Sequence, residues 1–145
     1  MPDETDSPTA LRAALWRTVR LVNVSSGRLP AEAVVAARRI ADTLAEIIDT
    51  SDVRPLDVSV VISIRATVDD YLPTTLRSYL VLDPSLLALR RADGATPTES
   101  LLEQLTVLQD STSAVLAAAH SQDLDMLVSQ GNFLRTKFSR SDLDL

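Results

Sequence analysis

The single histidine of this 145-residue chain is the first place to look for chemistry. The segment "HSQDLD" brings His120, Asp123 and Asp125 close together in sequence, and side chains of these types can bind a metal ion. Joined by a serine, they can also catalyse hydrolysis. One nitrogen ligand is a poor basis for a metal site, and no GxSxG pattern supplies a nucleophile. We expect instead that His120 ends one helix and that Asp123 caps the next.

Other forms of catalysis find little support in the composition. The chain has no cysteine, which excludes thiolate nucleophiles and cysteine metal sites. Its three glycines stand far apart, so no glycine-rich loop can cradle a phosphate. Asp69 and Asp70 are neighbours, and on a helix their side chains point about 100° apart, so they do not share one site. The sequence predicts no catalytic, cofactor-binding or metal-binding residues.

A basic arc on the first expected helix is the best candidate for a binding surface. Arg12, Arg17 and Arg20 fall on one side of residues 8–24, and Trp16 lies at the edge of that arc. A basic amphipathic helix with a boundary tryptophan can bind a membrane surface or an acidic partner. The alternative is an ordinary bundle helix whose arginines face water or pair with acids of neighbouring helices. Whether this helix is buried in the bundle or exposed stays open.

Length and composition indicate one domain built on an aliphatic core. Apolar residues make up 46% of the chain and aromatic residues only 3%. The net charge of −6 argues against nucleic-acid binding, which needs a basic surface.

We expect a disordered acidic tail at 1–6, a helical domain at 7–138 and a frayed end at 139–145. Without a leader pattern or an 18-residue apolar run, we expect a cytoplasmic protein, with peripheral attachment to the inner membrane face as the alternative.

Helix-start signals and helical spacing predict an all-α, compact, bundle-like domain of five to six helices. Ser7-Pro8 and Asp83-Pro84 each combine a capping side chain with a proline at the first helical position. Thr96-Pro97-Thr98-Glu99 adds the glutamate of a capping box. Pro84 is expected to open a short helix that ends before Gly94, and the helix after Pro97 is expected to run to about residue 119. A break at 121–123 then separates it from a last helix that carries Leu124, Leu127, Val128, Leu134 and Phe138.

The segment 56–72 is ambiguous between a helix and a strand. Its run "VSVVISI" is rich in β-branched residues, which favours a strand. However, Val61, Ile64 and Val68 also recur at helical spacing, and no second candidate strand is available for pairing. We therefore favour a helix.

The stretch "DDYLPTTLRSYL" follows, and it is expected to form a corner between two helices near residue 73. Pro73 suits the first position of a new helix, since the amide that it lacks has no partner there. In this interpretation Leu72 is the N-cap, and Tyr71 packs against Leu76 as a hydrophobic staple. The expected structural corner consists of Tyr71, Leu72, Pro73, Leu76 and Tyr79.

The same stretch, with the terminal pattern "DLDMLVSQGNFLRTKF", resembles the helical part of the bacterial family named for 5-bromo-4-chloroindolyl phosphate hydrolysis. The similarity covers residues 69–138 and rests on Tyr71-Leu72-Pro73, Thr75-Leu76, Tyr79 and the terminal Leu/Phe spacing. It implies an all-α fold, phosphatase-like activity and an association with toxic-anion resistance at the membrane. The chain departs from that family in having no membrane-spanning segment before the motif, and only Arg77 among the matching residues suits a phosphate.

These observations lead to three hypotheses about function. The first is a non-enzymatic helical interaction or accessory protein, in a bacterial envelope or toxic-anion stress context, that binds a protein partner or itself. The second is a peripheral membrane-surface protein that docks through the basic arc of its first helix. The third is a small hydrolase that acts on phosphate esters.

Overall fold

The computed structural model describes residues 4–143, and all regular structure in that range is helical. The all-α prediction is confirmed, and the ambiguous segment is a helix rather than a strand. The helices are α1 (Pro8–Ser25), α2 (Ala31–Asp49), α3 (Val58–Ala66), α4 (Leu72–Leu80) and α5 (Pro97–Leu143).

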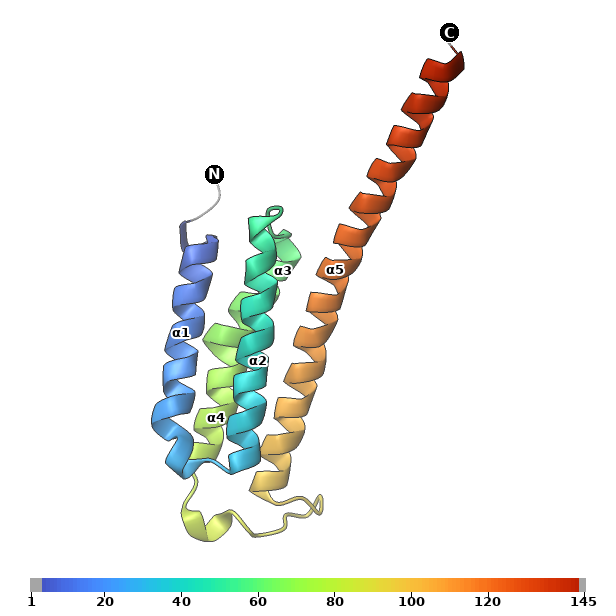
Figure 1. Ribbon diagram of the computed structural model, residues 1–145. Coiled ribbons are helices and arrows are strands. Elements are labelled where there is room, and N and C mark those ends of the chain that lie inside the picture. The colour runs from blue at the N-terminus through green and yellow to red at the C-terminus, as the bar shows by residue number, and fades with distance from the viewer. Residues whose placement is uncertain (1–3, 144–145) are drawn as a thin grey trace.

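The helices form an antiparallel bundle with four arms, where an arm is a single helix or two helices joined end to end (Figure 1). α1 and α2 run in opposite directions, α3 and α4 together form the third arm, and α5 returns beside α2. α2 packs against both α1 and α5, and α4 packs against both α5 and α1, so the four arms close around one core. The large side chains that are fully buried come from all four arms: Leu11, Val22, Ile40, Leu44, Ile47, Ile48, Ile64, Val68, Leu72, Leu76 and Leu105.

Two of the expected helix starts are made as the sequence predicts. The Ser7 hydroxyl accepts a hydrogen bond from the amide of Ala10 at 3.1 Å, and the Thr96 hydroxyl accepts one from the amide of Glu99 at 3.1 Å. The Glu99 carboxylate forms an ion pair with Arg90 at 3.3 Å, so the second half of the expected capping box is replaced by a contact to the preceding loop. Each cap satisfies an amide that has no partner within the helix.

The prediction of a short helix after Pro84 is wrong. Only Pro84–Leu86 forms a 3₁₀ turn, and the chain then runs as a loop to α5, with Gly94 at a φ of 85°. Most side chains from Asp83 to Gly94 are exposed. A helix this short is not stable in water without an apolar face packed on a core, so the segment has no reason to stay helical.

The predicted break at 121–123 is also wrong, because α5 is one helix of 47 residues. Neither a glycine nor a proline lies between residues 98 and 130, so nothing in the backbone stops the helix. α5 runs through the expected frayed end as far as Leu143, and Glu4–Asp6 forms a 3₁₀ turn where a disordered tail was expected. The distal part of α5 extends beyond the bundle (Figure 1). We call residues 124–143 the overhang, which is about 30 Å long at 1.5 Å per residue.

The predicted corner at Pro73 is absent. α3 continues into α4 through a π-helical turn, Thr67–Tyr71, and both Tyr71 and Leu72 have helical backbone angles. Leu72 is therefore not an N-cap: its amide donates to the carbonyl of Thr67, five residues back. The wider turn lets the chain pass the proline without ending the helix.

Candidate interaction surfaces

The residues around His120 do not form a reactive cluster. His120 is exposed in the middle of α5, so it neither ends a helix nor precedes a new one. Asp123 forms an ion pair with Arg54, whose Nε lies 2.7 Å from Oδ1. Within residues 4–143 no group of three or more histidine, aspartate or glutamate side chains is placed to hold a metal ion.

Arg54 holds α5 at the point where that helix leaves the bundle. Its Nη2 donates to the carbonyl of Ala119 at 3.0 Å, in addition to the ion pair with Asp123. Close by, the Gln122 side chain donates to the Asp57 carboxylate at 3.2 Å. The loop between α2 and α3 thus contacts residues 119–123, and the overhang begins directly after this contact.

The π-helical turn creates an acceptor that another helix satisfies. In a regular α-helix the amide of Leu72 would donate to the carbonyl of Val68, but here it donates to the carbonyl of Thr67. The next residue, Pro73, has no amide to donate instead. The hydroxyl of Thr18, which is buried on α1, donates to this carbonyl at 2.7 Å. A buried carbonyl without a partner is costly, so Thr18 joins α1 to the bulge.

The expected corner residues divide into a buried set and an exposed tyrosine. Leu72, Leu76 and Tyr79 are buried as expected, and the Tyr79 hydroxyl lies 3.1 Å from that of Thr98 at the start of α5. Tyr71 is 54% exposed and does not form the predicted staple with Leu76. The π-helical turn carries Tyr71 onto the outer face of the helix, where it has no core to enter.

The charged residues of the same stretch form local contacts. Asp69 pairs with Arg65 at 3.3 Å, and Asp70 accepts a hydrogen bond from Thr74 at 3.1 Å. The two carboxylates have different partners, which agrees with the prediction that they do not share a site. Arg77 is exposed and lines a cleft of about 190 Å³ together with Asp69 and Arg17.

The first helix is buried on one face and exposed on the other, which answers the question left open by its sequence. Trp16 is 70% exposed, and Arg17 and Arg20 are also exposed on the outer face. Arg12 forms an ion pair with Asp49 at the end of α2, at 3.0 Å. The basic arc therefore exists, but one of its three arginines is already paired within the chain.

The overhang carries the apolar residues that were expected to lie in a bundle helix. Among the overhang side chains that the structure describes, none forms a hydrogen bond or ion pair with another element, although Leu134 is only 40% exposed. On a helical wheel, one stripe about 120° wide holds four apolar side chains and Gly131. The exposed fractions of the four are 63% for Leu124, 69% for Leu127, 61% for Val128 and 40% for Leu134. The side chain of Phe138, which continues the spacing, lies outside the described residues.

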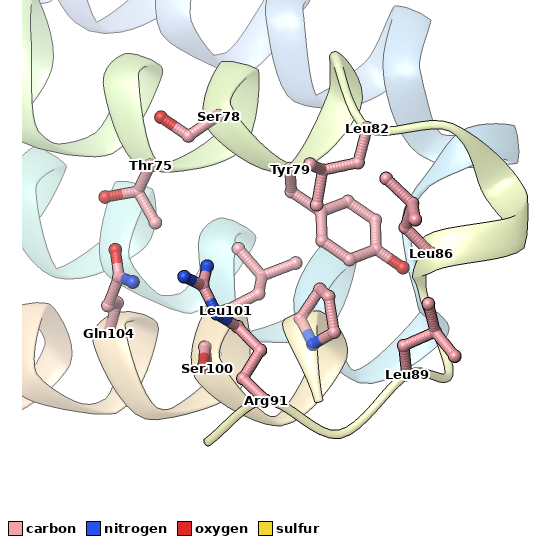
Figure 2. Close-up of a pocket in the computed structure, with 11 residues that line it drawn as sticks. Thr75, Ser78, Tyr79, Leu82, Leu86, Leu89, Arg91, Ser100, Leu101 and Gln104 are labelled. Carbon is pink, nitrogen blue, oxygen red and sulfur yellow. The ribbon is translucent and has the colours of Figure 1, made fainter. Parts of the chain in front are cut away.

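A pocket that the sequence analysis missed lies at the opposite end of the bundle. It has a volume of about 380 Å³ and is formed by α4, the loop 83–96 and the first turns of α5 (Figure 2). Its residues come from three separated segments, and no local motif marks them. The one available signal is the run of leucines in a segment that has no helical role, Leu86, Leu87 and Leu89.

The loop that covers this pocket is held by its own hydrogen bonds. The Asp83 carboxylate accepts from the amide and the hydroxyl of Ser85, at 2.9 and 2.7 Å, and these hydrogen bonds lower the pKa of Asp83. At the other end, the amide of Arg91 donates to the carbonyl of Ala95 at 3.0 Å across the turn that contains Gly94. The pocket is therefore lined by a segment of defined shape.

Comparisons of the chain with protein-family models, curated proteins and solved structures give no match. The resemblance to the 5-bromo-4-chloroindolyl phosphate hydrolysis family therefore stays a prediction from its residues. Across residues 4–143, no helix combines the length and the apolar character needed to cross a membrane.

Proposed function

We propose that this chain is a non-enzymatic helical interaction protein that pairs with a second copy of itself through the overhang. The observation that carries this proposal is the exposed apolar stripe of Leu124, Leu127, Val128 and Leu134 on a helix that extends beyond its own bundle. An isolated helix of this length is marginal in water, and apolar residues at heptad spacing are typical of a helix that packs against another helix.

The charges of this part of α5 favour an antiparallel pair. Asp125 stands at its start, just after the Asp123 that pairs with Arg54, and Arg135 and Lys137 stand near its end. Two parallel copies would place like charges beside each other, whereas two antiparallel copies would place acids beside bases. This complementarity within one sequence is the reason to choose a second copy over an unrelated partner.

One antiparallel register fits the stripe well. When Leu124 faces Leu134 of the second copy, Leu127 faces Gly131, whose missing side chain gives the leucine room. The same register places Asp123, which also pairs with Arg54 of its own chain, near Arg135 of the second copy. Because the overhang extends from one end of its bundle (Figure 1), this register places the two bundles at opposite ends of the paired segment.

Sedimentation velocity of the full chain over a range of concentrations tests the pairing. We expect a monomer–dimer equilibrium that Leu127→Glu with Leu134→Glu abolishes, because the two charges enter the apolar seam. Phe133→Glu is the matched control, since Phe133 is 61% exposed on the opposite face of the same helix. A monomer at every concentration, or equal effects of the two changes, would contradict the proposal.

Because the chain has no cysteine, disulfide trapping can test the orientation. Leu124→Cys and Leu134→Cys chains should cross-link when mixed, whereas Leu124→Cys alone should not. In the antiparallel register the two copies of residue 124 are about 15 Å apart along the axis, beyond the reach of a disulfide. Cross-linking of Leu124→Cys alone would indicate a parallel pair.

A membrane-docking role for α1 is the second candidate, and the exposure of Trp16 beside Arg17 and Arg20 favours it. Because Arg12 pairs with Asp49, the basic arc of α1 has fewer unpaired charges for docking than the sequence predicted. Flotation with anionic vesicles at low salt tests this role. Binding that salt weakens, and that Arg17→Gln with Arg20→Gln removes, would support docking through α1. Protein that stays at the bottom of the gradient would exclude it.

A further inference from the structure

The pocket beneath the loop 83–96 is divided into an apolar end and a polar end. Figure 2 shows Leu82, Leu86 and Leu89 gathered beside the ring of Tyr79 on one side. On the other side, Thr75 and Gln104 face each other across the opening (Figure 2). The volume of about 380 Å³ lies within the range of small-molecule sites.

The apolar end is uncovered in the protein alone. Leu86 is 41% exposed and Leu89 is 56% exposed, although both side chains line the pocket. Leaving large apolar side chains in water is unfavourable, and an apolar occupant would remove that surface from water. The occupant that fits this end is a hydrocarbon chain or ring.

The polar end holds the one charged side chain that lines the pocket, Arg91. Figure 2 shows its guanidinium reaching from the loop to a position between Gln104 and Leu101. Within residues 4–143 that guanidinium forms no hydrogen bond or ion pair. The neighbouring Arg90 pairs with Glu99 at 3.3 Å and donates to the carbonyl of Gly94 at 2.8 Å. Glu99 therefore already has a partner in Arg90.

We infer that this pocket binds a medium-chain fatty carboxylate, with the hydrocarbon chain among Leu82, Leu86 and Leu89 and the carboxylate on Arg91. A guanidinium matches a carboxylate in both charge and planar geometry and forms two parallel hydrogen bonds with it. The Gln104 amide and the Thr75 hydroxyl lie on the same side and can donate to the same oxygens. This inference does not depend on the overhang, which lies at the other end of the bundle.

Isothermal titration of the full chain with octanoate, 1-octanol and acetate tests the inference. Octanoate should bind at a single site, and acetate, which lacks the chain, should give no saturable heat. Arg91→Gln should weaken octanoate binding roughly tenfold, because a charged hydrogen-bond pair is lost, and should leave octanol binding unchanged. Leu89→Ser should weaken the binding of both octyl compounds.

Arg39→Gln is the matched control, since Arg39 is exposed on α2 and does not line the pocket. The inference is wrong if octanoate fails to saturate the wild-type protein, or if Arg91→Gln and Arg39→Gln have the same effect. A further arm uses phosphatidylglycerol vesicles as the source of anion and chain. Vesicle binding that Arg91→Gln weakens but Arg17→Gln with Arg20→Gln does not, in protein that fails to bind free octanoate, would assign the pocket to a lipid surface and overturn the inference.

Discussion

Thr18 shows how one side chain supports an irregular backbone in another helix. Its hydroxyl donates to the carbonyl of Val68. That carbonyl has no donor in its own helix, because the π-helical turn directs the amide of Leu72 to Thr67 and Pro73 has no amide. The sequence contains both residues, but their 50-residue separation hides the contact. By its usual local rule, Pro73 predicts the start of a helix. In the structure, a hydrogen bond from a distant threonine stabilises a continuous helix instead.

We expect Thr18→Val to lower the free energy of unfolding by about 1–3 kcal/mol, because it leaves a buried carbonyl without a donor. Thr112→Val is the matched control. Thr112 is buried to the same extent, 4% exposed in each case, but its hydroxyl donates to carbonyls of its own helix. Those carbonyls also accept hydrogen bonds from helical amides, so Thr112→Val should change the free energy of unfolding very little. Urea denaturation of both variants measures the difference.

Pro73→Ala completes this test as a double-mutant cycle. An alanine restores an amide at position 73, which can donate toward the carbonyls that the proline leaves free. The loss caused by Thr18→Val should therefore be smaller in the Pro73→Ala background than in the wild type. Additive effects of the two changes would show that the hydroxyl and the missing amide are independent.

At the scale of elements, the sequence predicted α1 closely, and both α1 and α2 follow a single local rule, apolar residues at helical spacing. The apolar residues of α2 at helical spacing, from Val34 to Ile48, are all buried in the core. The segment around VSVVISI is also helical as predicted, although its β-branched residues favour a strand. Its Ile64 and Val68 enter the core of the bundle, and this tertiary packing overrides the local preference.

The errors at the element scale occurred where a local capping signal competed with a longer-range effect. Asp123 resembles an N-cap in sequence, but it binds Arg54 from the loop after α2 while α5 continues. Asp83-Pro84 is a true cap, yet only one 3₁₀ turn follows, because among residues 85–94 only Leu87 packs against the core. Cap residues specify where a helix can begin, and packing determines whether it extends.

For the whole molecule, the sequence indicated the fold class and the basic arc of α1, but neither the pocket nor the exposure of the apolar stripe on the overhang. The pocket requires α4, α5 and the loop 83–96 to meet, and the residues that line it are separated by up to 29 positions, from Thr75 to Gln104. The apolar stripe of the overhang was recognised, but it was placed inside the bundle. The expected break before Leu124 would have let that helix fold back, and its absence leaves the stripe exposed.

The continuity of α5 leads to a last prediction about how stability is distributed. Residues 97–119 are held by the core, whereas the overhang in a single copy has only its own helical hydrogen bonds. Isolated helices of about 20 residues open readily in water, so the amides of 124–143 should exchange with deuterium faster than those of 97–119 in a dilute, monomeric sample. Exchange followed by mass spectrometry resolves the two parts of the helix.

Concentration then distinguishes pairing from an intrinsically stable helix. If two overhangs pair, their amides become protected as the protein is concentrated, because only the paired state buries the stripe. This gain should be absent in Leu127→Glu with Leu134→Glu and retained in Phe133→Glu, while residues 97–119 exchange alike in all three. Protection of 124–143 that does not depend on concentration, in every variant, would mean that the overhang is stable alone and that its exposed leucines have another role.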